Sequence, residues 1–418
     1  MWPRKQIDVG AADIAYGMGQ VLWGGAEESA ALSPDPGWIP DDEALVCLSV
    51  RSGFDLLLTA LGLPPGSEIV VSAVTIPDMV RIIEHHGCVA VPVDVDLERL
   101  EVSAEALEAA ITPRTRAVLV AHLFGSRMRM EPLVALARRH RLVVIEDCAQ
   151  AYVGRGYAGH SVSDVALFSF GPIKTATALS GAVLRVRNPG LLARMRSIQA
   201  GYPRQRRTAY LARLLKYAAL KTVGRPKLYG ALVGTCRRLG VDYDRLFSSL
   251  THGFSTTDFF RRIRHRPCGP LVAMLRRRIA RFDDADAERL ERRTQRGERL
   301  ARQLEGCAAV PGSRNPTHTY WVVPLLVTNR AAVRAALRKA GFDAADRSSL
   351  VVVPRRDQDL NGRPRQHWLN DLLFLPDSAE MPAAEFDAMC RIVESTAEPR
   401  GISSHQQSRE STVVALPR

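Results

Sequence analysis

The sequence predicts an α/β protein with a mostly parallel central sheet and a smaller C-terminal α+β domain. Between residues 44 and 186, short β-branched or apolar segments alternate with amphipathic segments, as in consecutive βαβ units. The chain has 418 residues, which is too long for one ordinary domain. That length suits a large α/β domain followed by a smaller one.

The strands expected in the first half are short and rich in valine. They span residues 68–72, 89–93, 117–121 and 142–146. The segments between them, at 78–86, 103–110 and 132–140, carry apolar residues at the three-and-four spacing of a helix. Ligands of such sheets bind at the carboxyl ends of the strands, so the residues that directly follow each strand are the candidates for a functional site.

Four regions are expected along the chain. Residues 1–200 form the large domain with an N-terminal arm, 201–282 a basic helical insertion, 283–397 a long helix with the small domain, and 398–418 a disordered tail. The tail is rich in Ser, Gln and Pro and lacks hydrophobic periodicity. In the third region, strands are expected at 320–327 and 349–353, and helices at 283–304, 330–340 and 383–394.

The composition is that of a globular protein, with 46% hydrophobic and 24% charged residues. The chain contains no run of about 20 apolar residues, the length needed to span a membrane. The first residues are not followed by the apolar stretch of a signal peptide, so a cytoplasmic location is expected. Seven cysteines are scattered without a Cys-x-x-Cys pair. This odd number argues against a closed disulfide framework, and the spacing argues against a structural metal site.

The formal charge of +13 is concentrated in one segment, because residues 203–281 contain 19 Lys and Arg against three acidic residues. Three interpretations stay open. The segment could be a solvated helical insertion, a face that attracts an anionic substrate such as a nucleotide-linked sugar, or a peripheral membrane contact in which Lys and Arg alternate with Leu, Tyr and Phe. Nucleic acid is disfavoured, because no recognition motif accompanies the charge.

Two strand ends carry residues that point to a chemistry. The segment 144–150 is a hydrophobic strand that ends in Asp147, and the segment 166–174 is an apolar strand that ends in Ser169, followed by a turn and Lys174. A carboxylate at a strand end can pair with the pyridinium nitrogen of pyridoxal 5'-phosphate (PLP) and keep it protonated. A lysine beside that cofactor can form a Schiff base with it and then move a proton. A lone lysine after a strand is ordinarily a surface residue. The presence of Asp147, Gln150 and Ser169 in the same two segments favours the functional interpretation of Lys174.

These residues resemble the DegT/DnrJ/StrS family of PLP-dependent sugar aminotransferases, which has the aspartate-aminotransferase-like fold, PLP fold type I. The family shows an I-E-D-x-A-Q-A motif, an S-F-x-x-x-K motif about twenty residues later, and upstream a V-x-P-V-D-V-D strand and a V-H-L-x-G turn. This chain has both cofactor motifs, and residues 91–96 and 121–125 match the upstream ones. The resemblance is close over residues 40–200. It is looser over 285–395, where Thr319-Tyr-Trp and Leu373-Phe-Leu-Pro-Asp carry it.

The resemblance implies a role for each residue of the two cofactor motifs. Lys174 corresponds to the Schiff-base lysine and Asp147 to the partner of the pyridine nitrogen. Gln150 corresponds to a neighbour of the ring hydroxyl, and Ser169 to a phosphate ligand.

It also implies the remaining cofactor contacts. In the turn that family members form as Ser/Asn-Gly-Thr, Ser52 and Gly53 match, whereas Phe54 replaces the threonine and its hydroxyl. Backbone N–H groups there, at a helix N-terminus, would hold the phosphate. Ile76 stands where members usually place an aromatic ring against the cofactor. Ser255 is the nearest counterpart of an asparagine that reaches the cofactor of the neighbouring subunit.

The resulting prediction is a homodimeric PLP-dependent aminotransferase. It would move an amino group from glutamate or glutamine to a keto group of a sugar, nucleotide sugar or cyclitol. Two alternatives stay open: a non-catalytic or regulatory protein of the same fold, in which Phe54 and the missing asparagine reflect lost turnover, and a PLP-dependent lyase. Lys174 itself disfavours the family's dehydratase branch, which has histidine at that position.

Overall fold

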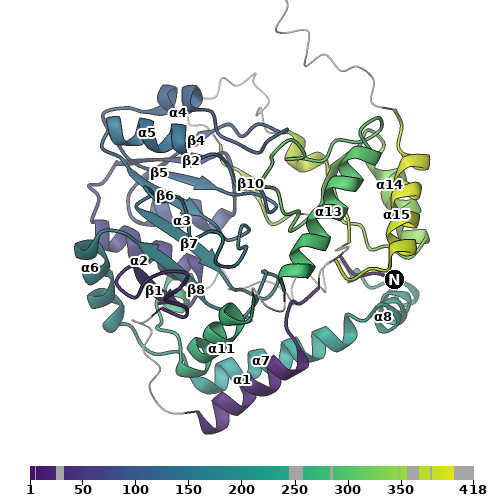
Figure 1. Cartoon of the computed structure of the whole chain (residues 1–418), viewed down its shortest axis with the longest axis horizontal. Helices are drawn as coiled ribbons and strands as arrows, with labels where there is room; N and C mark the ends of the chain where they lie inside the picture. The colour runs from purple at the N-terminus through teal and green to yellow at the C-terminus, as the bar shows by residue number, and fades with distance from the viewer. Residues whose placement is uncertain are drawn as a thin grey trace, which may run out of the picture.

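A seven-stranded sheet forms the centre of the large domain (Figure 1). The computed structural model describes residues 1–4, 6–24, 33–243, 258–282, 286–346, 348–354, 367–376 and 379–399. The sheet has the order β1-β8-β7-β6-β5-β2-β4. The pairs of β8 with β1 and with β7 are antiparallel and the other four pairs are parallel, which confirms the predicted mostly parallel sheet. Its strands are Ala44–Cys47 (β1), Glu68–Ser72 (β2), Val89–Val93 (β4), Thr115–Ala121 (β5), Val143–Asp147 (β6), Val165–Ser169 (β7) and Ala182–Val186 (β8).

Helices cover both faces of this sheet, because successive side chains of a strand point to opposite sides. On β6, Ile145 packs in the core formed with α2, α3 and α6, whereas Val144 packs in the core formed with α4 and α5. Phe168 of β7 faces α1, α7 and α11. These helices are Ala11–Trp23 (α1), Val50–Leu61 (α2), Pro77–His85 (α3), Ala104–Ala110 (α4), Glu131–Arg139 (α5), Pro189–Ala200 (α6), Arg207–Val223 (α7) and Gly269–Ala280 (α11).

The segment expected to be a basic helical insertion contains α7, Pro226–Arg238 (α8), Phe259–Ile263 (α10) and α11. Two of these helices are part of the large domain's core: Tyr210 and Leu214 of α7, and Leu271 of α11, are fully buried against α1 and the sheet. The helix α8 instead reaches the small domain, where the Tyr229 hydroxyl donates to the buried Asp343 carboxylate at 2.5 Å. The segment therefore joins both domains.

The small domain follows the helix Ala287–Gln303 (α13), which lies between the two domains (Figure 1). It contains Pro324–Leu326 (β9), Arg330–Lys339 (α14), His367–Asp371 (η1), Leu372–Phe374 (β11) and Ala383–Thr396 (α15). The strand Val351–Val352 (β10) pairs instead with Val74–Thr75 (β3) of the large domain. The expected tail lies outside the described residues from 400 onward.

The strand predicted over residues 320–327 is wrong at its start, because only β9 is regular. The Thr319 N–H donates to the Gly125 carbonyl at 2.9 Å and the Val322 N–H to the Phe124 carbonyl at 3.4 Å, both in the large domain. Tyr320 between them has a φ of 48°, outside the strand region. The backbone N–H groups of Thr319 and Val322 are therefore bonded to the large domain and cannot pair within a longer strand of the small domain.

The N-terminal arm, residues 1–4 and 6–10, connects the small domain to the loop of residues 170–181 between β7 and β8, which carries Lys174 and is called the cofactor-motif loop. The Trp2 N–H donates to the Gly341 carbonyl at 2.7 Å, and Arg4 forms two 2.8 Å hydrogen bonds with Asp343. At its other end, Asp8 accepts the Ala176 N–H at 2.7 Å. In the described residues, no helix is long and apolar enough to cross a membrane.

Candidate active site

Asp147 and Lys174 lie at the carboxyl ends of the neighbouring strands β6 and β7, as the two motifs predict. Burial raises the pKa of the Asp147 carboxyl group. The Ala149 N–H, which donates to Asp147 Oδ1 at 3.0 Å, and the positive charge of Lys174 act in the opposite direction. A cation placed beside this carboxyl group would therefore favour its ionised form.

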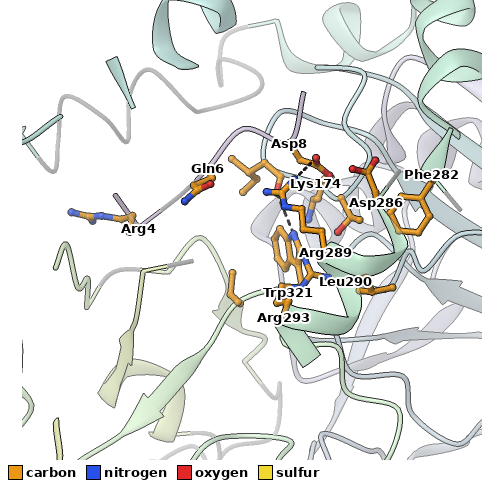
Figure 2. A pocket seen from close by; sticks show the side chains of 13 residues that line it. Arg4, Gln6, Asp8, Lys174, Phe282, Asp286, Arg289, Leu290, Arg293 and Trp321 are labelled. Carbon is orange, nitrogen blue, oxygen red and sulfur yellow. Dashed lines mark hydrogen bonds and ion pairs between the residues drawn. The ribbon is translucent and has the colours of Figure 1, made fainter. Parts of the chain in front are cut away.

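Trp321 covers the amine of Lys174 (Figure 2). The Lys174 Nζ lies 4.1 Å from the centroid of the indole ring, and the Trp321 Nε1–H donates to the Ile173 carbonyl at 3.2 Å. An ammonium group over an aromatic face gains about 0.5–2 kcal/mol. The amine thus lies between the large domain, which carries Lys174, and the chain entering the small domain, which carries Trp321.

A turn at Phe124–Gly125 positions Trp321. The Gly125 carbonyl accepts the Thr319 N–H at 2.9 Å and the Thr319 hydroxyl at 3.0 Å, while the Phe124 N–H donates to Gln150 Oε1 at 2.8 Å. Gly125 has a φ of 100°, and a Cβ there would lie 2.6 Å from the Trp321 backbone nitrogen. Only glycine fits both constraints. Gln150, predicted as a neighbour of the cofactor, holds this turn through its side-chain oxygen.

The first turn of α2 contains the predicted phosphate-binding residues. The Ser52 N–H donates to the N-cap Ser49 Oγ at 3.1 Å, and the two hydroxyl oxygens are 2.9 Å apart. A Cβ at Gly53 would lie 2.7 Å from a Leu184 methyl carbon, so this glycine lets the helix approach β8 closely. Phe54 is completely buried in the core, which leaves it no side-chain contact with a ligand. The positive charge of Arg51, in the same turn, lowers the pKa of the Asp147 carboxyl group.

The remaining predicted cofactor contacts are Ile76, Ser169 and Ser255, and the structure describes the first two. Ile76 is the N-cap residue of α3 and packs, half-buried, against the core on the α2 side of the sheet. Ser169 ends β7, with its Oγ 3.5 Å from the Gly171 nitrogen. Ser255 lies outside the described residues.

A buried hydrogen-bond network lies on the strand ends beside Asp147. His122 Nδ1 accepts the Met128 N–H at 3.1 Å, so Nε2 carries the proton and donates to Glu146 at 3.0 Å. The Tyr157 hydroxyl donates to the same Glu146 oxygen at 2.5 Å. Burial alone would raise the pKa of Glu146, but the bonds from His122 and Tyr157 hold it at about 2. His122 is 1% exposed, and both of its ring nitrogens are hydrogen-bonded, to Glu146 and to the Met128 N–H.

This network predicts an acid-sensitive contribution to stability. The pKa of Glu146 is depressed in the folded protein, so its contribution is complete above the ordinary value of 4.5 and is lost as the pH falls toward about 2. We expect Glu146→Gln to lower the free energy of unfolding at neutral pH by about 1–3 kcal/mol. Denaturant unfolding between about pH 5 and pH 3 should then show a shallower loss of stability than the wild type. The exposed Glu305→Gln is the control, and an equal slope in both variants would contradict the assignment.

Lys174 lines a pocket, and Trp321 is the one other lining residue that a sequence motif had marked (Figure 2). Its volume is about 590 Å³ when the open solvent at its mouth is included. The walls come from the N-terminal arm, the cofactor-motif loop, α13 with the residues before it, and the start of the small domain. The charged residues among them are Arg4, Asp8, Lys174, Asp286, Arg289 and Arg293. Asp8 is paired with Arg289 and Arg278, and Arg293 Nε donates to the Thr319 carbonyl at 2.9 Å.

Part of the chain matches the model of a known protein family. Residues 38–220 match the model of the DegT/DnrJ/EryC1/StrS aminotransferase family. GDP-perosamine synthase from Caulobacter vibrioides is 37% identical over 159 residues, an alignment that covers 37% of this chain and 43% of that enzyme. The match therefore spans less than half of the relative's length.

Solved structures resemble the chain over nearly its whole length. The aminotransferase TlmJ from Streptoalloteichus hindustanus has a TM-score of 0.68 at 18% identity, covering 95% of this chain and 98% of its own. The PLP-form of the putative sugar aminotransferase Spr1654 from Streptococcus pneumoniae has a TM-score of 0.66 at 16% identity, with coverages of 94% and 99%. PseC from Helicobacter pylori has a TM-score of 0.67 at 14% identity, with coverages of 94% and 98%. These similarities confirm the predicted PLP fold type I.

Proposed function

We propose that the protein is a PLP-dependent aminotransferase that moves an amino group from glutamate or glutamine to a keto group of a sugar, nucleotide sugar or cyclitol. The observation that carries the proposal is the pair of Lys174 and Asp147 on neighbouring strand ends, within a domain of the aminotransferase family. The proposal places the reaction in the cytoplasm, the location expected from the sequence.

The residues present fit PLP. Asp147 is half-buried, has one oxygen bonded to the Ala149 N–H, and would hold the pyridine nitrogen. Burial raises the pKa of its carboxyl group, so a cation beside it favours the ionised form. The first turn of α2, with Ser52 and Gly53, would hold the phosphate together with Ser169. Lys174 would hold the aldehyde carbon. When bound, PLP supplies an electron sink that stabilises negative charge on the carbon that bears the amino group.

The side chains around this site then have separate tasks. Lys174 Nζ moves a proton to and from the substrate carbon. Trp321 covers that amine and limits the access of water to it. Ile76 covers a face of the ring without aromatic stacking. The pocket beside Lys174 is lined by four cationic and two acidic side chains, which favours anionic donors and acceptors.

The proposal includes a homodimer in which Ser255 contributes to the active site of the partner subunit. It rests on the family resemblance, since this residue lies outside the described ones. Light scattering coupled to size-exclusion chromatography measures the mass. A monomer that is fully active would contradict this part of the proposal.

The reaction is tested by following the formation of 2-oxoglutarate from glutamate. The acceptor is the GDP-linked keto precursor of perosamine, chosen because GDP-perosamine synthase is a relative. We expect Asp147→Asn to lower kcat by about 10²–10³-fold, because an electrostatic stabiliser of the reaction is lost. Asp371→Asn, at an exposed position of η1, should have no effect.

Each alternative has a distinct outcome. Bound PLP without 2-oxoglutarate formation, for any keto sugar offered, would support the non-catalytic interpretation. Cleavage of the amino acid without amino transfer would support a lyase. Equal rates for Asp147→Asn and the wild type would show that Asp147 does not contact the cofactor.

A further inference from the structure

We propose that α7 and α8 form a surface that binds anionic lipid bilayers. We call it the basic helical face and define it by Leu215, Lys216, Lys227, Leu228, Arg238 and Leu239, all of which are exposed. This inference is independent of the reaction at Lys174, because none of these residues lines the pocket there.

The charge of this part of the chain is of one sign. Residues 203–241 contain ten Lys and Arg. No Asp or Glu occurs anywhere from Val165 to Val241. The helices α7 and α8 lie within this stretch. Each Lys or Arg close to an anionic membrane surface adds to the attraction, so the helices suit a negatively charged partner.

The exposed apolar side chains gather on the same elements. Seven large hydrophobic side chains are exposed in the described residues, and all except Val162 lie on α1, α7, α8 or the turn after α8. Leu239 at the end of α8 is 71% exposed, and Trp23 at the end of α1 is 82% exposed. Leucine beside lysine or arginine suits the membrane interface, where the apolar part enters the acyl region and the charge stays at the headgroups.

The three helices are arranged along one edge of the molecule. α1 packs directly against α7, and α7 continues into α8 after a short turn (Figure 1). Trp23 extends this edge at the end of α1, and tryptophan is enriched at membrane interfaces. A single extended edge could therefore lie on a planar surface.

A bilayer fits these observations better than two other partners. A second copy of the same face would bring like charges together without a carboxylate to pair with them. A nucleic acid would satisfy the charge but would not account for the exposed leucines. The combination of positive charge and exposed leucine favours anionic lipid.

The test uses the full chain and sedimentation with vesicles. We expect it to bind vesicles of phosphatidylcholine mixed with phosphatidylglycerol, to bind pure phosphatidylcholine poorly, and to lose binding as salt is raised. Lys216→Gln/Lys227→Gln/Arg238→Gln should weaken binding on the order of tenfold or more. Leu215→Ser/Leu228→Ser/Leu239→Ser should weaken it as well. The tryptophan emission should shift to the blue when vesicles are bound, and Trp23→Phe should remove this shift.

The matched control is Arg99→Gln/Arg302→Gln/Lys339→Gln, which removes the same charge from exposed positions outside the face. This control should bind vesicles nearly as well as the wild type. The proposal is wrong if the control weakens binding as much as the triple change on the face, or if no vesicle binding depends on anionic lipid. It is also wrong if the leucine variant alters the oligomeric mass instead, or if an oligonucleotide binds to the face more tightly than the vesicles do. All variants should keep the wild-type rate of amino transfer.

Discussion

Replacing Lys174 with alanine is expected to remove both amino transfer and the visible absorbance band that PLP gives when a protein lysine holds it covalently. The side chain has two tasks in the proposed function: it holds the cofactor and it moves the proton at the substrate carbon. Proton transfer by a positioned side chain contributes about 10²–10⁴-fold, and the loss of the nucleophile adds to this. We therefore expect kcat to fall by roughly a thousandfold or more.

Absorbance spectra and 2-oxoglutarate formation, each measured with added PLP, check this result. Lys339→Ala, at an exposed position at the end of α14, is the control and should behave as the wild type does. A variant at Lys174 that keeps the visible band would mean that another lysine holds the cofactor. If the wild type itself gives no such band with PLP, the proposed function fails at its first step.

Replacing Gly125 with alanine is expected to have the largest effect on stability. Two costs combine at this position. A φ of 100° is strained for any residue with a Cβ, and the Cβ would lie 2.6 Å from the Trp321 backbone nitrogen and 2.8 Å from the Thr319 hydroxyl. Since the nearest of these atoms is backbone, the turn and Trp321 must separate. We expect the free energy of unfolding to fall by about 2–4 kcal/mol.

The same change should impair the reaction, because Trp321 would no longer cover the Lys174 amine. Thermal unfolding and kcat, measured on the same sample, test both effects. Gly66→Ala is a matched control: its φ of 81° carries a similar strain, but nothing lies within 4 Å of the added Cβ. If both variants lose the same stability, the contact between Gly125 and Trp321 is not what requires glycine.

The sheet and the positions of the two candidate site residues could be predicted from the sequence because their signals are local. The runs that became β2, β4, β5 and β6 alternate with helical segments, and each strand was predicted to within a few residues. Asp147 ends one such strand, and Lys174 follows another after a short turn. The parallel arrangement of β6 and β7 then places them at one edge without any further information.

The covering of the Lys174 amine could not be predicted in this way. Trp321, Arg293 and Asp8 come from segments far apart in the chain, and only the Thr319-Tyr-Trp match to the family marked one of them. The strand expected at 320–327 failed for the same reason. Its first residues bond to the Gly125 turn, a partner that no pattern near residue 320 indicates.

The sequence by itself determined the α/β fold and the positions of the candidate residues at the strand ends, because hydrophobic periodicity and short motifs act over a few neighbouring residues. The tertiary structure alone decided that His122 is a buried partner of Glu146, that Phe54 belongs to the core, and that α7 and α11 complete one layer of the large domain. It also brought the N-terminal arm and Trp321 to the Lys174 amine. Such long-range contacts depend on how the whole chain packs, which the spacing of residues does not encode.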